Sequence, residues 1–312
     1  MKKFATLSLV FALLFTLNAI SADYEFKVNT VKGNVQVKQG SDWTACKKGS
    51  TLSKTAMIKV GQNGYVGLVH KSGDPVEVNK SGNYSVSKLA SKAGKKKGEV
   101  TKKFTKFIMD ELGESDDLLA SDDFNENMAT LGAVERAMFY KSDMNVRFPR
   151  SSYTIQNIVN FSWYEMENAK EYTFFIKSPD DEVIFEQKVI GTDLNVDLNT
   201  ANIGTGECFY WGVKANGKTS EEYCLYRMNT DEKSDFNSEM QELMNEIDSQ
   251  SSIGQLIMAS FYSENQMVNE ARTCYEKAIE ISPEVDNFKA LYAKYLIQIG
   301  LSNEAEDLVK NN

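Results

Sequence analysis

The stretch SIGQLIMASFYSENQMVNEARTCYEKAIEISPEV, residues Ser252–Val285, carries the pattern that decides the fold of the C-terminal third of the chain. Its small residues Ala259 and Ala271 are followed, about 34 residues later, by Ala293 and Ala305. Small side chains at this spacing let paired helices approach closely, and a period of this length is typical of stacked helix pairs. The pattern predicts an all-α helical-repeat segment over residues 231–312.

The same stretch resembles a tetratricopeptide repeat. The signature positions that match are Ala259, Tyr262, Ala271, Tyr275, Ala278 and Pro283, with Gly300 at the turn of the next period. Gln255 stands where the family has a tryptophan, and Met258 stands where it has a leucine. The resemblance implies that aromatic residues fill the space between helix pairs and that Pro283 ends the second helix. It also implies peptide or protein binding on a concave face.

The array is short, with a little under two repeats, whereas stacked repeats usually need about three to stand alone. Upstream, Phe236, Met240, Leu243 and Ile247 lie on one face of a predicted helix. We expect this helix, from about Asp235 to Ile247, to cap the array. Alternatively, the array packs on the preceding module or on a second subunit.

The preceding module, residues 129–230, returns to the period of two that is typical of strands. The strands expected from this pattern are Phe161–Trp163, Tyr172–Ile176, Val183–Phe185, Leu194–Leu198, Phe209–Val213 and Tyr223–Tyr226. Their regular spacing predicts a β-sandwich, and their order resembles a fibronectin type III or related immunoglobulin-like module. Trp163, Tyr172, Trp211 and Val213 are then core residues and not a platform for stacking sugars.

The N-terminal module, residues 23–89, consists of short alternating apolar runs separated by glycines, which predicts a compact all-β unit. It resembles a FecR-type domain. The matching residues are Gly33-Asn34-Val35, Trp43, Gly49-Ser50-Thr51-Leu52 and the strand-rich stretch Ala56–Val69. Lys71-Ser72-Gly73-Asp74 stands where the family commonly has an Asp-Gly turn. The fold class expected for the whole chain is therefore multidomain, with β-rich N-terminal two-thirds followed by helices.

Between these two β modules, residues 90–128 pass from lysine-rich to acidic sequence. Phe104, Phe107, Ile108 and Leu112 fall at helical spacing, so we expect an amphipathic helix from about Thr101 to Gly113, followed by a linker. A lysine cluster can bind anionic lipid or glycan, but a solvated charged face is the simpler interpretation and the one that we favour.

Residues 1–22 have the features of a secretory signal peptide. Lys2 and Lys3 precede the apolar run Leu7–Leu17 and a small, polar stretch that ends at Ala22. Cleavage there removes two lysines and no acid, so the formal charge changes from −9 to −11. We expect a periplasmic protein, with the cell surface as an alternative and with no integral membrane segment after cleavage. An acidic chain of this kind is not expected to bind nucleic acid.

The four cysteines show no metal-binding spacing. Cys208 and Cys224 flank the predicted hairpin turn Ala215–Lys218 at similar distances, so they either form a disulfide or are two separately buried thiols. Cys46 and Cys274 lie in different modules, and a bond between them has little support.

Catalytic and metal-binding patterns are weak in this sequence. Cys46 and the single histidine, His70, share a module, but no local motif orients the imidazole. The run Asp123, Asn125, Asn127 imitates a calcium loop and lacks its glycine and glutamate. Asp180 and Asp181 fit a turn between strands. No catalytic residue, metal ligand or cofactor is therefore assigned.

Three functions remain from the sequence. The leading one is a non-catalytic, exported envelope binding or scaffold protein with a protein partner, or with cell-wall glycan as its ligand. The FecR resemblance implies the first alternative, a periplasmic signalling component. The second alternative is an enzyme of unrecognised type, which a cleft containing clustered, perturbed carboxylates would favour.

Overall fold

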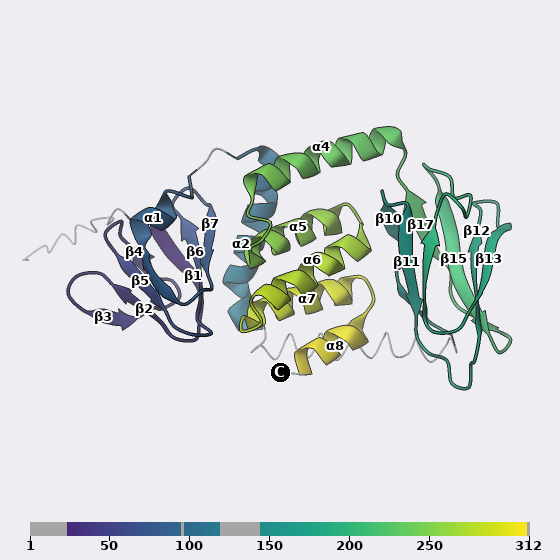
Figure 1. The fold of residues 1–312 in the computed structure, drawn as a ribbon, viewed down its shortest axis with the longest axis horizontal. Coiled ribbons are helices and arrows are strands. Elements are labelled where there is room, and N and C mark those ends of the chain that lie inside the picture. Colours follow the sequence, from purple (N-terminus) through teal and green to yellow (C-terminus); the bar gives the residue numbers. More distant parts are fainter. Residues whose placement is uncertain (1–23, 95–96, 119–143, 311–312) are drawn as a thin grey trace, which may run out of the picture.

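The computed structural model describes residues 24–94, 97–118 and 144–310. It is β-rich in its N-terminal and middle regions and all-α in its C-terminal segment (Figure 1). The helices lie between the two β regions, so segments far apart in sequence meet at both ends of the helical layer. The predicted signal peptide, residues 1–22, lies outside the described residues.

The N-terminal region contains two four-stranded sheets, ordered β4-β1-β6-β7 and β3-β2-β5-β8 among the described residues. The strands are β1 Phe26–Lys32, β2 Val35–Lys38, β3 Trp43–Ala45, β4 Thr51–Leu52, β5 Met57–Val60, β6 Tyr65–His70, β7 Pro75–Val78 and β8 Gly82–Ser85. Alternate residues such as Phe26, Val28, Val35 and Val37 point into a shared core. Strands β3, β4 and β8 are short and only weakly apolar, so a pattern of alternating apolar residues does not identify them. Trp43 is 38 % exposed.

Two helices follow these sheets, α1 Val86–Ala90 and α2 Glu99–Leu118. Helix α2 is longer than the predicted helix, because Gly113 lies inside it instead of ending it; an internal glycine weakens a helix by about 1 kcal/mol and does not stop it. Its buried face contains Phe104, Ile108 and Leu112, whereas Phe107 is 49 % exposed. The helix is part of the helical layer. Beyond residue 118, the linker predicted to follow it lies outside the described residues.

The middle region is a sandwich of two sheets, ordered β10-β17-β15-β12-β13 and β14-β11-β9, with β16 paired to β15. Its strands are β9 Val146–Phe148, β10 Ser152–Thr154, β11 Ile158–Trp163, β12 Tyr172–Lys177, β13 Val183–Val189, β14 Asp193–Asp197, β15 Cys208–Ala215, β16 Lys218–Thr219 and β17 Tyr223–Arg227. Trp163, Tyr172, Trp211 and Val213 are all buried in its core, as the strand pattern predicts. Strands β9 and β10 were missed, since three residues are too few to show a period of two.

The sandwich contains a disulfide between Cys208 of β15 and Cys224 of β17, with an S–S distance of 2.05 Å. The strands pair antiparallel, with Cys208 opposite Tyr226 and Tyr210 opposite Cys224. Ala215 pairs with Lys218, so Asn216 and Gly217 form the two-residue turn, and both have positive φ. Asn-Gly supplies the left-handed conformation that such tight hairpins require. Cys46 and Cys274 are buried free thiols.

The C-terminal segment comprises α4 Thr230–Glu246, α5 Ser252–Glu264, α6 Val268–Ile281, α7 Asp286–Gln298 and α8 Ser302–Lys310. Asn229 and Glu232 form a capping box that begins α4. The repeated small residues lie where helices pack closely, since Ala259, Ala271, Ala278, Ala293 and Ala305 are each 0 % exposed. Pro283 follows the end of α6, and Gly300 adopts φ +79° just after α7, which closes that helix.

The helical core draws side chains from every neighbouring part of the chain. It contains Tyr65 of β6, Phe104 of α2, Phe148 of β9 and Met228, which follows β17, together with the residues of α4–α8. Phe104 contacts the ring of Phe261 edge-to-face, with 5.4 Å between ring centroids. The short array therefore gains stability from both β regions and from α2.

None of the helices among the described residues has the length and apolarity needed to cross a membrane.

Candidate functional site: the seam between the sandwich and the helical array

The sandwich meets the helical array through the edge of strand β10 and the turn between α5 and α6. The backbone N–H of Tyr153 donates to the carbonyl of Gln266 at 3.0 Å. The hydroxyl of Ser152 donates to the same carbonyl at 3.2 Å and accepts from the N–H of Val268 at 3.1 Å. These bonds satisfy edge-strand groups that would otherwise need water or another strand.

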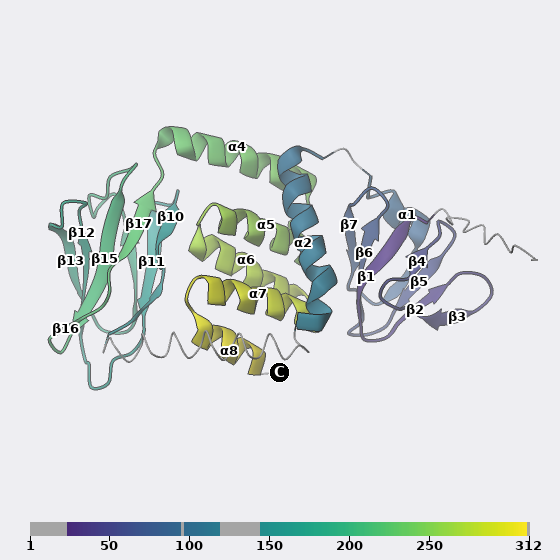
Figure 2. The same cartoon turned by 180° about the vertical axis from the view of Figure 1, so that it is seen from behind.

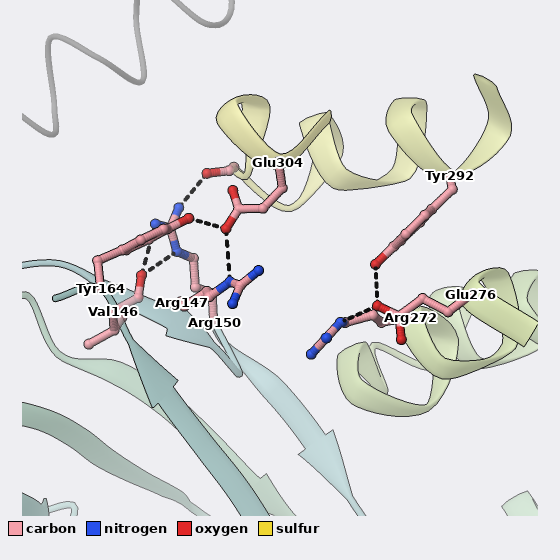
Figure 3. Close-up of polar contacts among 9 residues, drawn as sticks. Val146, Arg147, Arg150, Tyr164, Arg272, Glu276, Tyr292 and Glu304 are labelled. Atoms are coloured by element: carbon pink, nitrogen blue, oxygen red, sulfur yellow. Dashed lines mark hydrogen bonds and ion pairs between the residues drawn. The ribbon is translucent and has the colours of Figure 1, made fainter. Parts of the chain in front are cut away.

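A second set of bonds joins the sandwich to the turn between α7 and α8 (Figure 3). Arg147 Nε and the Tyr164 hydroxyl both donate to Glu304 Oε1, the arginine at 3.1 Å. Arg150 donates to the carbonyl of Val146 and to that of Gly300. Charge-assisted bonds of this kind are stronger than neutral ones, so these contacts strengthen the attachment of the sandwich to the array.

Arg272 of α6 divides the seam into two clefts. Its guanidinium lies 4.5 Å from the ring centroid of Phe148, and its Nε donates to Glu276 Oε1 at 2.8 Å. The Tyr292 hydroxyl donates to the same carboxylate oxygen at 3.0 Å (Figure 3). The stack of Arg272 on Phe148 combines cation–π attraction with a fixed guanidinium orientation.

The first cleft, here called the arginine cleft, has a volume of about 420 Å³. It is lined by side chains of both charges and by apolar groups: Arg147, Phe148, Arg272, Glu276, Lys289, Tyr292, Leu296, Glu304, Asp307 and Leu308. Its arginines are already paired with carboxylates, because Arg147 bonds to Glu304 and Arg272 bonds to Glu276. The lining is therefore balanced in charge, with three basic and three acidic residues.

The second cleft, here called the glutamate cleft, has a volume of about 410 Å³ and lies between β10, β11 and the first turns of α6. Tyr153, Ile158, Val159, Leu225 and Tyr262 form much of its wall, and Glu270 is its one acidic residue. Burial raises the pKa of Glu270, while the residue's own backbone N–H acts in the opposite direction. Burial also raises the pKa values of Tyr262 and Cys274, each to about 12.

The opposite end of the array is closed by the N-terminal sheets. The Glu77 carboxylate of β7 accepts from the N–H groups of Ser252 and Ile253 at 2.8 and 3.1 Å, which places a negative charge at the N-terminus of α5. The Tyr65 hydroxyl donates to Glu77 Oε2 at 3.2 Å. This end of the array therefore serves as a structural joint.

Helix α2 covers one face of the array, the face formed by α5 and α7 (Figure 2). Lys103 pairs with Glu264 of α5, and Glu111 pairs with Lys294 of α7. The N–H of Gly98, just before α2, donates to the Glu246 carboxylate of α4. The lysine-rich sequence is thus partly used for contacts within the chain, although Lys102 and Lys106 remain exposed.

The structure places the two residues of the weak catalytic pair beside strands of different sheets. Cys46 follows β3 and is buried, which raises its pKa to about 11. His70 ends β6, and its ring contacts the Glu25 carboxylate at 3.3 Å and the Ser72 hydroxyl at 2.7 Å. Ser72 also bonds to Asp74 at 2.8 Å. This network stabilises the turn that connects β6 to β7.

Asp180 and Asp181 lie in the turn between β12 and β13, where the N–H of Asp181 donates to the carbonyl of Ser178. The calcium-like run Asp123, Asn125, Asn127 lies outside the described residues. Within the parts of the chain that the structure describes, no group of three or more histidine, cysteine or acidic residues is arranged to hold a metal ion.

Sequence reasoning missed both clefts. Each requires residues from 147–160 to meet residues from 269–274, and no local pattern encodes that meeting. One signal was available: Glu270 and Arg272 are charged residues close to the small residue Ala271, which marks close helix packing. Charged side chains next to a closely packed position lie at the edge of the helix contact. Here that edge is the seam.

No protein-family model matches this chain, and no curated protein matches its sequence.

Proposed function

We propose that this is an exported envelope binding or scaffold protein that holds an extended segment of a protein partner in the seam between the sandwich and the helical array. The observation that carries the proposal is the pair of adjoining clefts on either side of the Arg272–Phe148 stack. Their volumes are within the range of ligand-binding sites, and the ion pair between Arg147 and Glu304 joins the sandwich wall of the arginine cleft to its α8 wall.

The proposed identities of the modules support this role. We take the N-terminal unit as FecR-like, the sandwich as fibronectin type III-like and the helix pairs as tetratricopeptide-like. Fully buried alanines at the repeat positions and the left-handed Gly300 agree with the last of these. The resemblance assigns ligands to the face of the repeats, but α2 occupies the face of α5 and α7, so we place the partner at the seam.

A periplasmic location is part of the proposal. It is supported by the signal-peptide pattern of residues 1–22 and by the disulfide, since disulfides persist in oxidising compartments.

Site-specific photo-crosslinking in the native envelope tests the proposal. A benzophenone side chain replaces Ile158, which lines the glutamate cleft and is 63 % exposed. The matched control position is Ile190, which is 87 % exposed and follows β13, the strand at the opposite edge of its sheet from β10.

We expect one protein partner to be captured from position 158 and not from position 190. A peptide from that partner, added in excess to the purified proteins, should then abolish the crosslink. Equal capture from the two positions, or capture from position 190 alone, would show that the seam does not hold the partner.

A further inference from the structure

The glutamate cleft contains a carboxylate that has no cationic partner among the described residues. Glu270 lies in the first turn of α6 and is partly buried, and only its own backbone N–H is bonded to its carboxylate. The other ion pairs of the seam use different acids, since Arg147 bonds to Glu304 and Arg272 bonds to Glu276. A partly buried carboxylate without a counter-ion loses hydration without a compensating charge.

The walls of the same cleft are suited to an alkyl chain. Ile158, Val159 and Leu225 line it from the sandwich, and Tyr262 lines it from α5. Hydrogen-bond acceptors are spread over several elements, with Gln156 and Asn160 on the sandwich and Thr273 on α6. This distribution suits a compact ammonium group, whose three donors rotate freely, better than a guanidinium, whose donors form a rigid planar fork.

We propose that the glutamate cleft binds one lysine side chain of the partner, with Glu270 as the counter-ion of its ammonium group and the apolar wall around its methylene groups. This inference rests on the proposed function and names the chemistry of the residue that the partner inserts. The arrangement is a partly desolvated charge pair beside apolar contacts, and burial of this kind increases what a residue contributes to binding at an interface.

Titration of the purified full chain with Nα-acetyl-lysine amide, followed by NMR shifts of the α6 amides, tests the inference. We expect saturable shifts at the amides of residues 269–274, with a Kd on the order of 1 mM. The neutral isostere Nα-acetyl-norleucine amide should bind at least about tenfold more weakly, because it lacks the charge that pairs with Glu270.

Two variants identify the carboxylate. Glu270→Gln should weaken binding of the lysine probe about tenfold or more, whereas Glu280→Gln, an exposed position on the same helix, should leave it unchanged. Circular dichroism and the unfolding midpoint verify that both variants fold. Glu270→Asp keeps the charge and should retain part of the binding.

Binding should also strengthen as the pH rises through the pKa of Glu270. Only the ionised carboxylate attracts the ammonium, and the neighbouring Tyr262, Cys274 and Tyr295 all have raised pKa values, so they stay neutral over that range. Arg272 stays charged throughout, and the sandwich contributes Tyr153 as its titratable side chain in the cleft.

Equal binding of the lysine probe to wild-type protein and Glu270→Gln would overturn the inference, as would equal binding of the norleucine probe. Tighter binding of Nα-acetyl-arginine amide would overturn the choice of ammonium. If crosslinking from position 158 succeeds while the lysine probe does not bind, the proposed function stands and this inference falls. If the probe binds but position 158 captures nothing, the proposed function fails.

Discussion

The sandwich and the helical array organise their cores in different ways. All buried core residues of the sandwich lie between Met144 and Leu225, within the segment that forms its own strands. The core of the array includes Tyr65, Phe104, Phe148 and Met228, which come from both β regions and from α2. One region is self-contained, and the other is completed by its neighbours.

This difference follows from how much apolar surface each region can cover by itself. Two sheets packed face to face bury one face of each, and their large alternate side chains fill the space between them. Two helix pairs leave open faces at each end of the stack, and such arrays usually need about three repeats or dedicated caps. Here the caps are α2, α4 and the two β regions.

Separating the regions should have the largest effect. We expect residues 144–229, expressed alone, to fold with a cooperative transition, because their core and disulfide are internal. Residues 230–312 alone should show little stable helix at 25 °C, because they lack the side chains that complete their core. Far-UV circular dichroism with urea titration measures both. A cooperative transition from the isolated helices would contradict the idea of a shared core.

Phe104→Ala should produce the next largest effect. This side chain is 4 % exposed and packs on Phe261, so its removal should lower the free energy of unfolding of the helical region by about 3–5 kcal/mol. Phe107→Ala is the matched control on the same helix. Because Phe107 is 49 % exposed, its loss should change that free energy by no more than about 0.5 kcal/mol. If urea unfolding shows that Phe104→Ala and Phe107→Ala lower the free energy of unfolding equally, α2 does not complete the core.

The sequence predicted features that local patterns encode. Large residues at alternate positions identified Trp163 and Trp211 as core, and small residues at a fixed period identified the close contacts of Ala259 and Ala293. The helical spacing of Phe104, Ile108 and Leu112 correctly indicated that α2 buries a face. That spacing contains no information about which surface the face contacts, so the place of α2 on α5 and α7 was not predictable.

The candidate site was less predictable for the same reason. Glu270 and Ile158 are separated by more than a hundred residues and meet only after the sandwich edge docks on the turn between α5 and α6. That docking depends on backbone groups, such as the N–H of Tyr153 and the carbonyl of Gln266. Every residue type has a backbone carbonyl, and every type except proline has a backbone N–H. Side-chain patterns therefore do not encode it.

Removing the disulfide should affect the sandwich and leave the array nearly unchanged. Cys208 and Cys224 are separated by 16 positions, and closing a loop of this size restricts the unfolded chain by about 3 kcal/mol. The double variant Cys208→Ala, Cys224→Ala should lose about that much from the free energy of unfolding of residues 144–229. For contrast, Cys274→Ala removes a buried free thiol from α6, so any loss of stability that it causes should fall on the array. Two-domain fits to calorimetric scans should assign each loss to its own region.

The smallest effect concerns the joint between the N-terminal sheets and the array, where the pKa values of two carboxyl groups, Glu77 and Asp74, shift in opposite directions. Burial raises the pKa of Glu77, and the bonds it accepts from Ile253, Ser252 and Tyr65 only partly oppose this. Burial also acts to raise the pKa of Asp74, but Lys97, Ser72 and the N–H of Gly94 outweigh it, so that pKa is lowered.

The signs of these shifts give a test. Between the ordinary glutamate pKa of 4.5, which applies to the unfolded chain, and the raised folded pKa of Glu77, the folded state binds more protons than the unfolded state, so stability falls as pH rises through that range. The lowered pKa of Asp74 contributes stability that is fully present above pH 3.8, the ordinary aspartate pKa. This stability is lost as the pH falls through the lowered pKa. Glu77→Gln removes the first effect and keeps the second. The wild-type protein should therefore gain stability relative to Glu77→Gln when the pH is lowered from about 7.5 to about 5, by roughly 1 kcal/mol or less. A constant difference between their urea midpoints across that range would show that Glu77 is not desolvated at the joint, and that the N-terminal sheets close the array less tightly than the sandwich does.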